Sequence, residues 1–122
     1  MKTVLVVDDS RIMRTIVKNT FTNLKIVAQF LEAEDGKRAM QVLLNNPVDL
    51  ILLDWNMPNL SGIDFLRQVR SMDKYKRIPI IMVTSEAAKL SVVEAIKAGA
   101  TAYIAKPFTD AKILEKLSQI SF

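Results

Sequence analysis

The sequence contains no histidine and no cysteine, and its three glycines, Gly36, Gly62 and Gly99, stand far apart from one another. Without histidine or cysteine there can be no Ser-His-Asp triad, no Cys-His nucleophile and no ordinary zinc site. Without clustered glycines there is no P-loop and no GxGxxG turn to hold a nucleotide. Any chemistry must therefore rely on carboxylates, hydroxyls and lysines.

Long apolar runs are missing as well. No stretch reaches the roughly 20 apolar residues that a membrane-spanning helix needs, and Asp8, Asp9 and Arg11 interrupt the apolar start before a signal-peptide core can form. The absence of cysteine fits a reducing compartment, so we expect a cytoplasmic protein with no membrane partner. A length of 122 residues suits one domain. We expect a single monomeric domain over residues 1–122, with no output domain.

The formal net charge of +4 makes nucleic acid a partner to weigh. The basic residues are scattered over several segments, however, and form no run interleaved with aromatics. We interpret them as a solvated basic surface and expect no nucleic-acid partner. Binding to random DNA with a steep salt dependence would favour the opposite interpretation.

Five short apolar or β-branched runs alternate with segments whose apolar residues recur at helical spacing. The runs cover residues 3–7, 26–31, 48–53, 78–83 and 102–105. This alternation predicts a doubly wound α/β fold, with a parallel sheet and helices on both of its faces. Ser61 followed by Asp64, and Thr109 after Pro107, predict two helix N-caps. The uniformly apolar stretches 4–7 and 50–53 predict neighbouring central strands.

Acidic residues follow the two most apolar strands, Asp8 and Asp9 after the first and Asp54 after the third. Ligands of open parallel sheets bind beyond the carboxyl ends of the strands, so we expect these carboxylates to share one pocket. Two of them about 5 Å apart repel by roughly 3 kcal/mol at an effective dielectric near 20. A hard cation such as Mg²⁺ would relieve this repulsion. Simple helix capping is a reasonable alternative for Asp9 with Ser10, but not for all three acids.

The fourth strand ends at Thr84 and the fifth leads into Lys106, which brings a hydroxyl and a cation to the same edge. Each residue alone is ordinary, a strand-end hydroxyl and a solvated lysine. Together with the acids they supply the attacking oxygen, the metal and the fixed positive charge that phosphoryl transfer needs. We therefore predict one Mg²⁺-dependent phosphoryl-accepting site.

The residues at these strand ends resemble a response-regulator receiver, and the similarity covers essentially the whole chain. The motifs that carry it are Val7-Asp8-Asp9-Ser10, Asp54-Trp55-Asn56-Met57-Pro58, Gly62, Thr84-Ser85-Glu86, Tyr103 and Lys106-Pro107-Phe108-Thr109. The resemblance implies a flavodoxin-like (βα)5 fold with strand order 2-1-3-4-5. It also implies a signalling protein that catalyses only its own phosphorylation and dephosphorylation.

The resemblance assigns a role to each matching residue of the site. Asp54 accepts the phosphoryl group, and Asp8, Asp9, Asp54 and the backbone carbonyl of Asn56 hold Mg²⁺. Thr84 and Lys106 contact the phosphoryl oxygens.

Further roles follow from the same resemblance. A cis peptide precedes Pro107, and Asn56 together with Glu86 tunes the phosphoryl lifetime. Tyr103 swings inward as Thr84 moves, although a half-buried tyrosine of an edge strand is an equal interpretation.

Within the family, the chain is most similar to CheY-type chemotaxis proteins. That similarity implies a CheA-like histidine kinase as donor and the flagellar motor switch protein FliM as partner. The expected partner face consists of Lys89, Val92, Ile96, Tyr103, Lys106, Lys112 and Lys116. Its basic rim around apolar positions suits an acidic amphipathic peptide, and a solvated helix face is the alternative. The turn at 22–25 lacks the glycine usual in chemotaxis members, so we carry over no phosphatase partner.

Three other functions compete with a chemotaxis role. A phosphorelay or scaffold receiver would have the same site and a different, non-flagellar partner. A hydrolase of the haloacid-dehalogenase type also uses an aspartate nucleophile and Mg²⁺, but it needs an acid two residues later, where this chain has Asn56. A nucleic-acid-binding module is weakened by the scattered charge.

Overall fold

Strands and helices alternate along the chain as the sequence predicts. The computed structural model describes residues 1–85, 89–120 and 122. The strands are β1 (Lys2–Val7), β2 (Ala28–Ala33), β3 (Leu50–Leu53), β4 (Ile80–Thr84) and β5 (Ala102–Ala105). The helices are α1 (Arg11–Asn23), α2 (Gly36–Asn45), α3 (Gly62–Arg70), α4 (Lys89–Ala98) and α5 (Asp110–Gln119), with a short 3₁₀ turn η1 (Asp73–Tyr75) before β4.

The strands form one parallel sheet in the order β2-β1-β3-β4-β5. This order confirms the predicted doubly wound fold and the central position of β1 and β3. Because all strands run the same way, the residues that follow them meet at one edge of the sheet.

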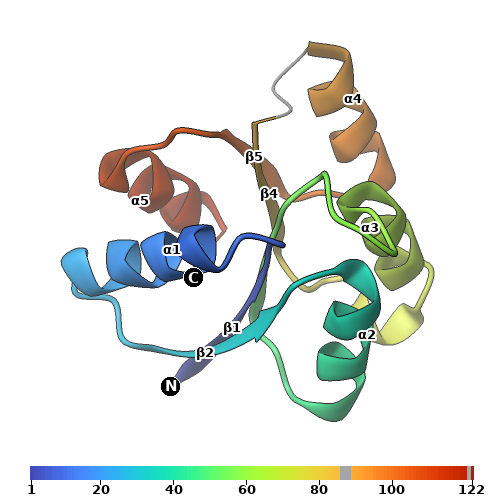
Figure 1. Cartoon of the computed structure of the whole chain (residues 1–122), viewed down its shortest axis with the longest axis horizontal. Coiled ribbons are helices and arrows are strands. Elements are labelled where there is room, and N and C mark those ends of the chain that lie inside the picture. Colours follow the sequence, from blue (N-terminus) through green and yellow to red (C-terminus); the bar gives the residue numbers. More distant parts are fainter. Residues whose placement is uncertain (86–88, 121) are drawn as a thin grey trace.

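Helices cover both faces of the sheet (Figure 1). In that view α1 and α5 lie to its left and α2, α3 and α4 to its right. The side chains of the central strands alternate between two core clusters, since successive residues of a strand point to opposite faces. Val4 and Val6 of β1 join the cluster beneath α1 and α5, whereas Leu5 and Val7 join the cluster beneath the other three helices.

Side-chain caps fix where four of the helices begin. Ser10, Asp35, Ser61 and Thr109 each accept a hydrogen bond from the backbone N–H three residues further on. The caps predicted at Ser61 and Thr109 are thus confirmed.

The second strand lies two residues later than predicted. Lys25 adopts a left-handed backbone conformation with φ of 59°, and the N–H of Ile26 donates to the carbonyl of Phe21 at 2.9 Å. This reversal closes the end of α1, so the chain becomes extended and pairs with β1 only from Ala28. The conformation of the turn at 22–25, which the sequence left open, is therefore a helix C-cap with lysine in the position that usually takes glycine.

The third and fourth strands also begin two residues later than predicted. The Asp49 carboxylate accepts a hydrogen bond from the N–H of Thr3 at 2.8 Å, and Pro79 has no N–H to donate to a neighbouring strand. Asp49 still donates its N–H to the Thr3 carbonyl at 2.8 Å, and the Pro79 carbonyl accepts from the N–H of Ile51 at 3.0 Å. Regular strand pairing begins one residue later, at Leu50 and Ile80.

Candidate functional site

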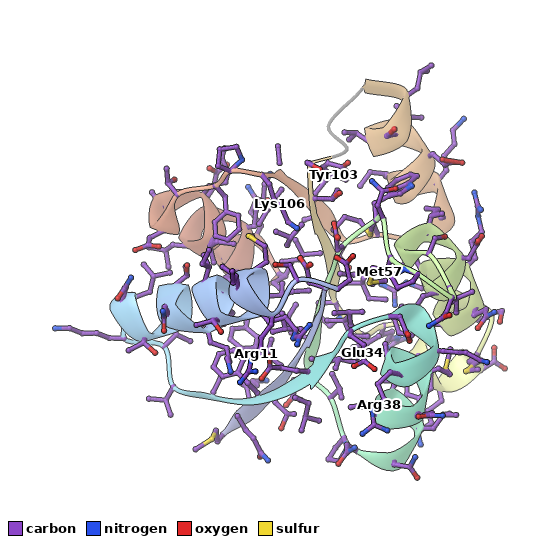
Figure 2. All side chains as sticks on the ribbon, viewed as in Figure 1. Arg11, Glu34, Arg38, Met57, Tyr103 and Lys106 are labelled. Atoms are coloured by element: carbon purple, nitrogen blue, oxygen red, sulfur yellow. The ribbon has the colours of Figure 1, made fainter. Side chains whose placement is uncertain are left out.

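The predicted site residues meet at the carboxyl edge of the sheet. Asp8 and Asp9 follow β1, Asp54 follows β3, Thr84 ends β4 and Lys106 follows β5. In Figure 2, Lys106 lies on the side of the site nearer α5. Met57, which belongs to the loop after Asp54, lies on the side nearer α3. Four strand ends thus bring together the residues that the sequence placed in one pocket.

Three carboxylates form the centre of the site. Asp8, Asp9 and Asp54 each offer a ligand oxygen within 4.8 Å of the others. Asp8 and Asp54 are buried, whereas Asp9 is exposed. Clustered carboxylate oxygens are the donors that hard divalent cations prefer, and an open side leaves room for water or a phosphoryl oxygen as further ligands. The residues present therefore fit a Mg²⁺ ion.

Lys106 neutralises part of this acidic cluster. Its ammonium nitrogen lies 2.7 Å from Asp8 Oδ2 and 3.5 Å from Asp54 Oδ1. The Lys106–Pro107 peptide is cis, as the resemblance implied. A compact ammonium on a flexible stem can exchange one oxygen partner for another, so Lys106 is placed to contact an oxygen of a group bound to Asp54.

The environment of Asp54 disfavours its charged form. Burial raises the pKa of the Asp54 carboxyl, and the nearby charge of Asp8 raises it further. The Lys106 ammonium and a hydrogen bond from the Thr84 side chain act in the opposite direction on this pKa. A backbone hydrogen bond from Trp55 also lowers this pKa, yet burial and the like charge of Asp8 outweigh all three favourable partners. A divalent cation would supply the missing positive charge.

The loop after Asp54 passes very close to that residue. A Cβ atom on Gly62 would lie 1.8 Å from the carbonyl oxygen of Asp54, so only glycine fits there. The N–H of Gly62 donates to the carbonyl of Trp55 at 2.8 Å. Asn56, the predicted carbonyl ligand, lies exposed in this tight loop two residues beyond Asp54.

A contact that the sequence did not reveal anchors the same loop to α2. The Asn59 amide donates to Asp35 Oδ2 at 2.6 Å, and the N–H of Gly36 donates to the carbonyl of Leu60 at 3.2 Å. The sequence carries one signal for this anchor, an aspartate before the helical segment that begins at Gly36. Its partner 24 residues away has no local signature.

Thr84 and Tyr103 connect the site to the neighbouring strand and helix. Thr84 is fully buried, and its carbonyl accepts a hydrogen bond from the N–H of Lys106 at 3.0 Å. Tyr103 is half-buried, packs against the core cluster beneath α2, α3 and α4, and has its hydroxyl oxygen shielded from solvent. Figure 2 shows it beside α4.

The predicted partner face extends over α4, β5 and α5. Ile96 and Lys112 are exposed, whereas Val92 and Lys116 are half-buried. Lys112 forms an ion pair with Glu115 at 3.2 Å. Glu86 and the side chain of Lys89 lie outside the described residues.

Comparisons with known proteins agree with this geometry. The sequence pattern of the response regulator receiver domain matches residues 4–118. The chain belongs to the response-regulator receiver family. It is 47% identical over 117 residues to a chemotaxis protein CheY homolog of Campylobacter jejuni, covering 95% of this chain and 89% of that protein.

Solved receiver structures superpose closely on the whole chain. CheY4 of Vibrio cholerae gives a TM-score of 0.88 at 33% identity and covers 98% of both chains. The Mn²⁺-bound response regulator Rcp1 gives a TM-score of 0.82 at 25% identity, with 99% of this chain and 92% of that chain covered. These neighbours confirm the CheY-like fold.

Membership of the family fixes the broad function. Receiver domains are two-component signalling proteins rather than conventional enzymes, and they bind Mg²⁺ at an acidic pocket such as the cluster of Asp8, Asp9 and Asp54. The CheY relatives indicate a role in chemotaxis, with a kinase and a motor switch as the general kinds of partner. Within the described residues, none of the helices is long and apolar enough to cross a membrane.

Proposed function

We propose that this receiver is a single-domain response regulator of CheY type, which accepts a phosphoryl group on Asp54 and then binds the flagellar motor switch. The observation that carries the proposal is the cluster of three carboxylates within 4.8 Å of one another, with the Lys106 ammonium 2.7 Å from Asp8. An acidic cluster that includes buried groups and is only partly neutralised by one lysine suits a site for a divalent cation and a transferred anionic group.

The site residues have distinct parts in the transfer. An oxygen of Asp54 attacks the phosphorus atom in line, a new P–O bond forms, and the P–N bond to the kinase histidine breaks with its electron pair leaving on the imidazole. Asp8, Asp9, Asp54 and the carbonyl of Asn56 would hold Mg²⁺, which when bound would supply positive charge beside the phosphoryl oxygens. Lys106 exchanges Asp8 for a phosphoryl oxygen, which holds the product in place.

The signal then reaches the partner face through Thr84. In this proposal the Thr84 hydroxyl turns toward the phosphoryl group and Tyr103 is held in the inward position, in which its hydroxyl is shielded from solvent. Asn56 and Glu86 tune how long the phosphoryl group persists. The new contacts favour an arrangement of α4, β5 and α5 that already exists as a minor state. The expected partner face combines the apolar Val92 and Ile96 of α4 with the cationic Lys112 and Lys116 of α5, and Lys89 is a further basic residue of that expected face. A surface of this composition suits the acidic amphipathic peptide that we propose as the FliM segment.

The donor and the downstream partner are separable parts of the proposal. A CheA-like histidine kinase is the proposed donor because the curated relatives are chemotaxis proteins. A phosphorelay receiver with a non-flagellar partner would have an identical site. Capture by phosphorylated protein of a flagellar switch protein, and not of a phosphotransfer protein, would favour the chemotaxis role.

The only tryptophan of the chain, Trp55, follows Asp54 directly and reports on the site. We expect its fluorescence to respond to Mg²⁺ and to change again with acetyl phosphate. The Asp54→Asn variant should lose the second change, and mass spectrometry should find a phosphoryl adduct on wild-type protein alone. If wild-type protein shows neither response and no adduct, the fold lacks receiver chemistry and the proposal is wrong.

A further inference from the structure

Asp8 is held at every one of its polar atoms. Its backbone N–H donates to the carbonyl of Ala33 on β2 at 3.0 Å. Its two carboxylate oxygens accept from the N–H of Ser10 at 2.9 Å and from Lys106 Nζ at 2.7 Å. The fourth contact comes from α1, where Arg14 Nη1 donates to the carbonyl oxygen of Asp8 at 2.5 Å.

The contact from Arg14 acts on the peptide group that joins Asp8 to Asp9. A peptide group is planar, so fixing its carbonyl oxygen also fixes the direction in which the chain continues to Asp9. Asp9 is exposed, unlike the buried Asp8 and Asp54. The direction of its carboxylate therefore depends strongly on this peptide plane.

Arg14 is itself held in one position. Its Nε atom donates to Glu32 Oε1 on β2 at 2.9 Å, and Lys18 binds the other oxygen of Glu32 at 2.9 Å. The Arg14 side chain is only 14% exposed. Figure 1 shows α1 beside β1 and β2, the arrangement that lets one guanidinium bridge the helix, the edge strand and the loop after β1.

We infer that Arg14 is a positioning residue for the divalent-cation site, which fixes the peptide between Asp8 and Asp9 so that both carboxylates face Asp54. The inference rests on the proposed function, because it assigns Arg14 a part in the same site. The planar guanidinium of Arg14 donates hydrogen bonds to Glu32 and to the Asp8 carbonyl at the same time. The single ammonium group of a lysine cannot do this in the same geometry. Residues that orient metal ligands in this way affect metal affinity without touching the metal.

Charge and geometry predict opposite effects for the loss of Arg14. Removing a positive charge near a cation site should tighten Mg²⁺ binding if only the summed electrostatic field matters. Loss of the fixed peptide should weaken binding, because the ligand oxygens must then be ordered when the ion binds. The sign of the change therefore separates the two explanations.

The test measures the Mg²⁺ dissociation constant from Trp55 fluorescence at constant ionic strength, for wild type, Arg14→Met, Arg14→Lys and Arg67→Met. Arg67 is the matched control, since it also forms ion pairs, with Asp64 and Glu94, on the opposite face of the sheet. We expect Arg14→Met to bind Mg²⁺ about tenfold more weakly and Arg14→Lys to restore little of the loss. Arg67→Met should stay within about twofold of wild type, because its charge is distant and screened.

Equal or tighter Mg²⁺ binding by Arg14→Met would overturn the inference while leaving the proposed function intact. A wild-type protein that ignores Mg²⁺ would overturn both. If circular dichroism shows that Arg14→Met does not fold, Glu32→Asp decides instead, because it keeps the net charge while drawing the carboxylate away from the guanidinium. That variant should bind Mg²⁺ about threefold more weakly than wild type, and an unchanged constant would contradict the role of Arg14.

Discussion

At the scale of single residues, the ionised carboxylate of Asp54 is held in surroundings that disfavour its charge. Its side chain is 9% exposed, and its carboxylate is affected by the nearby charge of Asp8. Lys106 is closer to Asp8 than to Asp54, at 2.7 Å against 3.5 Å, so it compensates Asp54 incompletely. In the metal-free protein, the charge of Asp54 should therefore lower the free energy of unfolding.

Replacing Asp54 by asparagine should stabilise the metal-free protein at neutral pH by about 1–2 kcal/mol, since it removes repulsion between close carboxylates. The gain should depend on pH, because burial and Asp8 raise the pKa of Asp54 in the folded state. Below the unfolded value, near 3.8, both states hold the proton and the gain should vanish. It should grow as pH rises through the folded pKa and then level off.

Urea unfolding in EDTA across this pH range measures the difference in the free energy of unfolding. Asp73→Asn is the matched control, because the Asp73 side chain is 93% exposed and forms a solvent-exposed ion pair with Lys76. It should change stability by less than about 0.5 kcal/mol. A destabilised Asp54→Asn protein at neutral pH would contradict this account of the site.

At the scale of elements, the turn between α1 and β2 carries the clearest local conflict between sequence and structure. Lys25 has a φ of 59°, a conformation that costs a non-glycine residue roughly 1–2 kcal/mol. Lys25→Gly should therefore raise the free energy of unfolding by about 0.5–1 kcal/mol, after the greater freedom of glycine in the unfolded chain is subtracted.

Chemical denaturation of wild type, Lys25→Gly and the control variant Lys37→Gly measures these changes in the free energy of unfolding. Lys37 lies in the first turn of α2, so the same exchange there should lower the free energy of unfolding by about 0.5–1 kcal/mol. Equal losses in the two variants would mean that the turn at Lys25 does not favour glycine.

The turn also shows where prediction from sequence reached its limit. Helix caps with a local signature, such as Ser61 and Thr109, were predicted because donor and acceptor lie three residues apart. The start of β2 was wrong by two residues, because apolar Ile26 and Val27 look like strand residues. Their backbone conformation follows instead from the way α1 closes.

At the scale of the whole molecule, the sheet separates two core clusters, one on each of its faces. The site lies at the edge of the sheet, just beyond the carboxyl ends of the strands that contribute to both clusters. The site could be foreseen, because parallel strands must end at one edge. The residues that support it could not be foreseen, since Arg14 meets Glu32 across 18 positions and Asn59 meets Asp35 across 24. Such pairs follow from the packing of the folded chain.

The coupling from site to partner face should depend on Thr84. Thr84→Ala should still accept a phosphoryl group on Asp54 but lose most of the phosphorylation-dependent gain in affinity for the motor-switch peptide, a coupling typically worth about 1–3 kcal/mol. Peptide titrations with and without phosphoryl donor measure the gain, and mass spectrometry confirms equal phosphorylation. Thr22→Ala, on the exposed end of α1, should behave as wild type. An undiminished gain in Thr84→Ala would exclude Thr84 as the switch.

The contact between Gly62 and Asp54 has a consequence for genetics. Gly62 carries no functional group, yet any side chain there would displace the backbone of Asp54 itself, because the added atom would lie 1.8 Å from its carbonyl oxygen. In a random-mutagenesis screen for lost signalling, Gly62 should therefore appear among the intolerant positions together with Asp54, and suppressor mutations should be found in the loop between them rather than at the carboxylates.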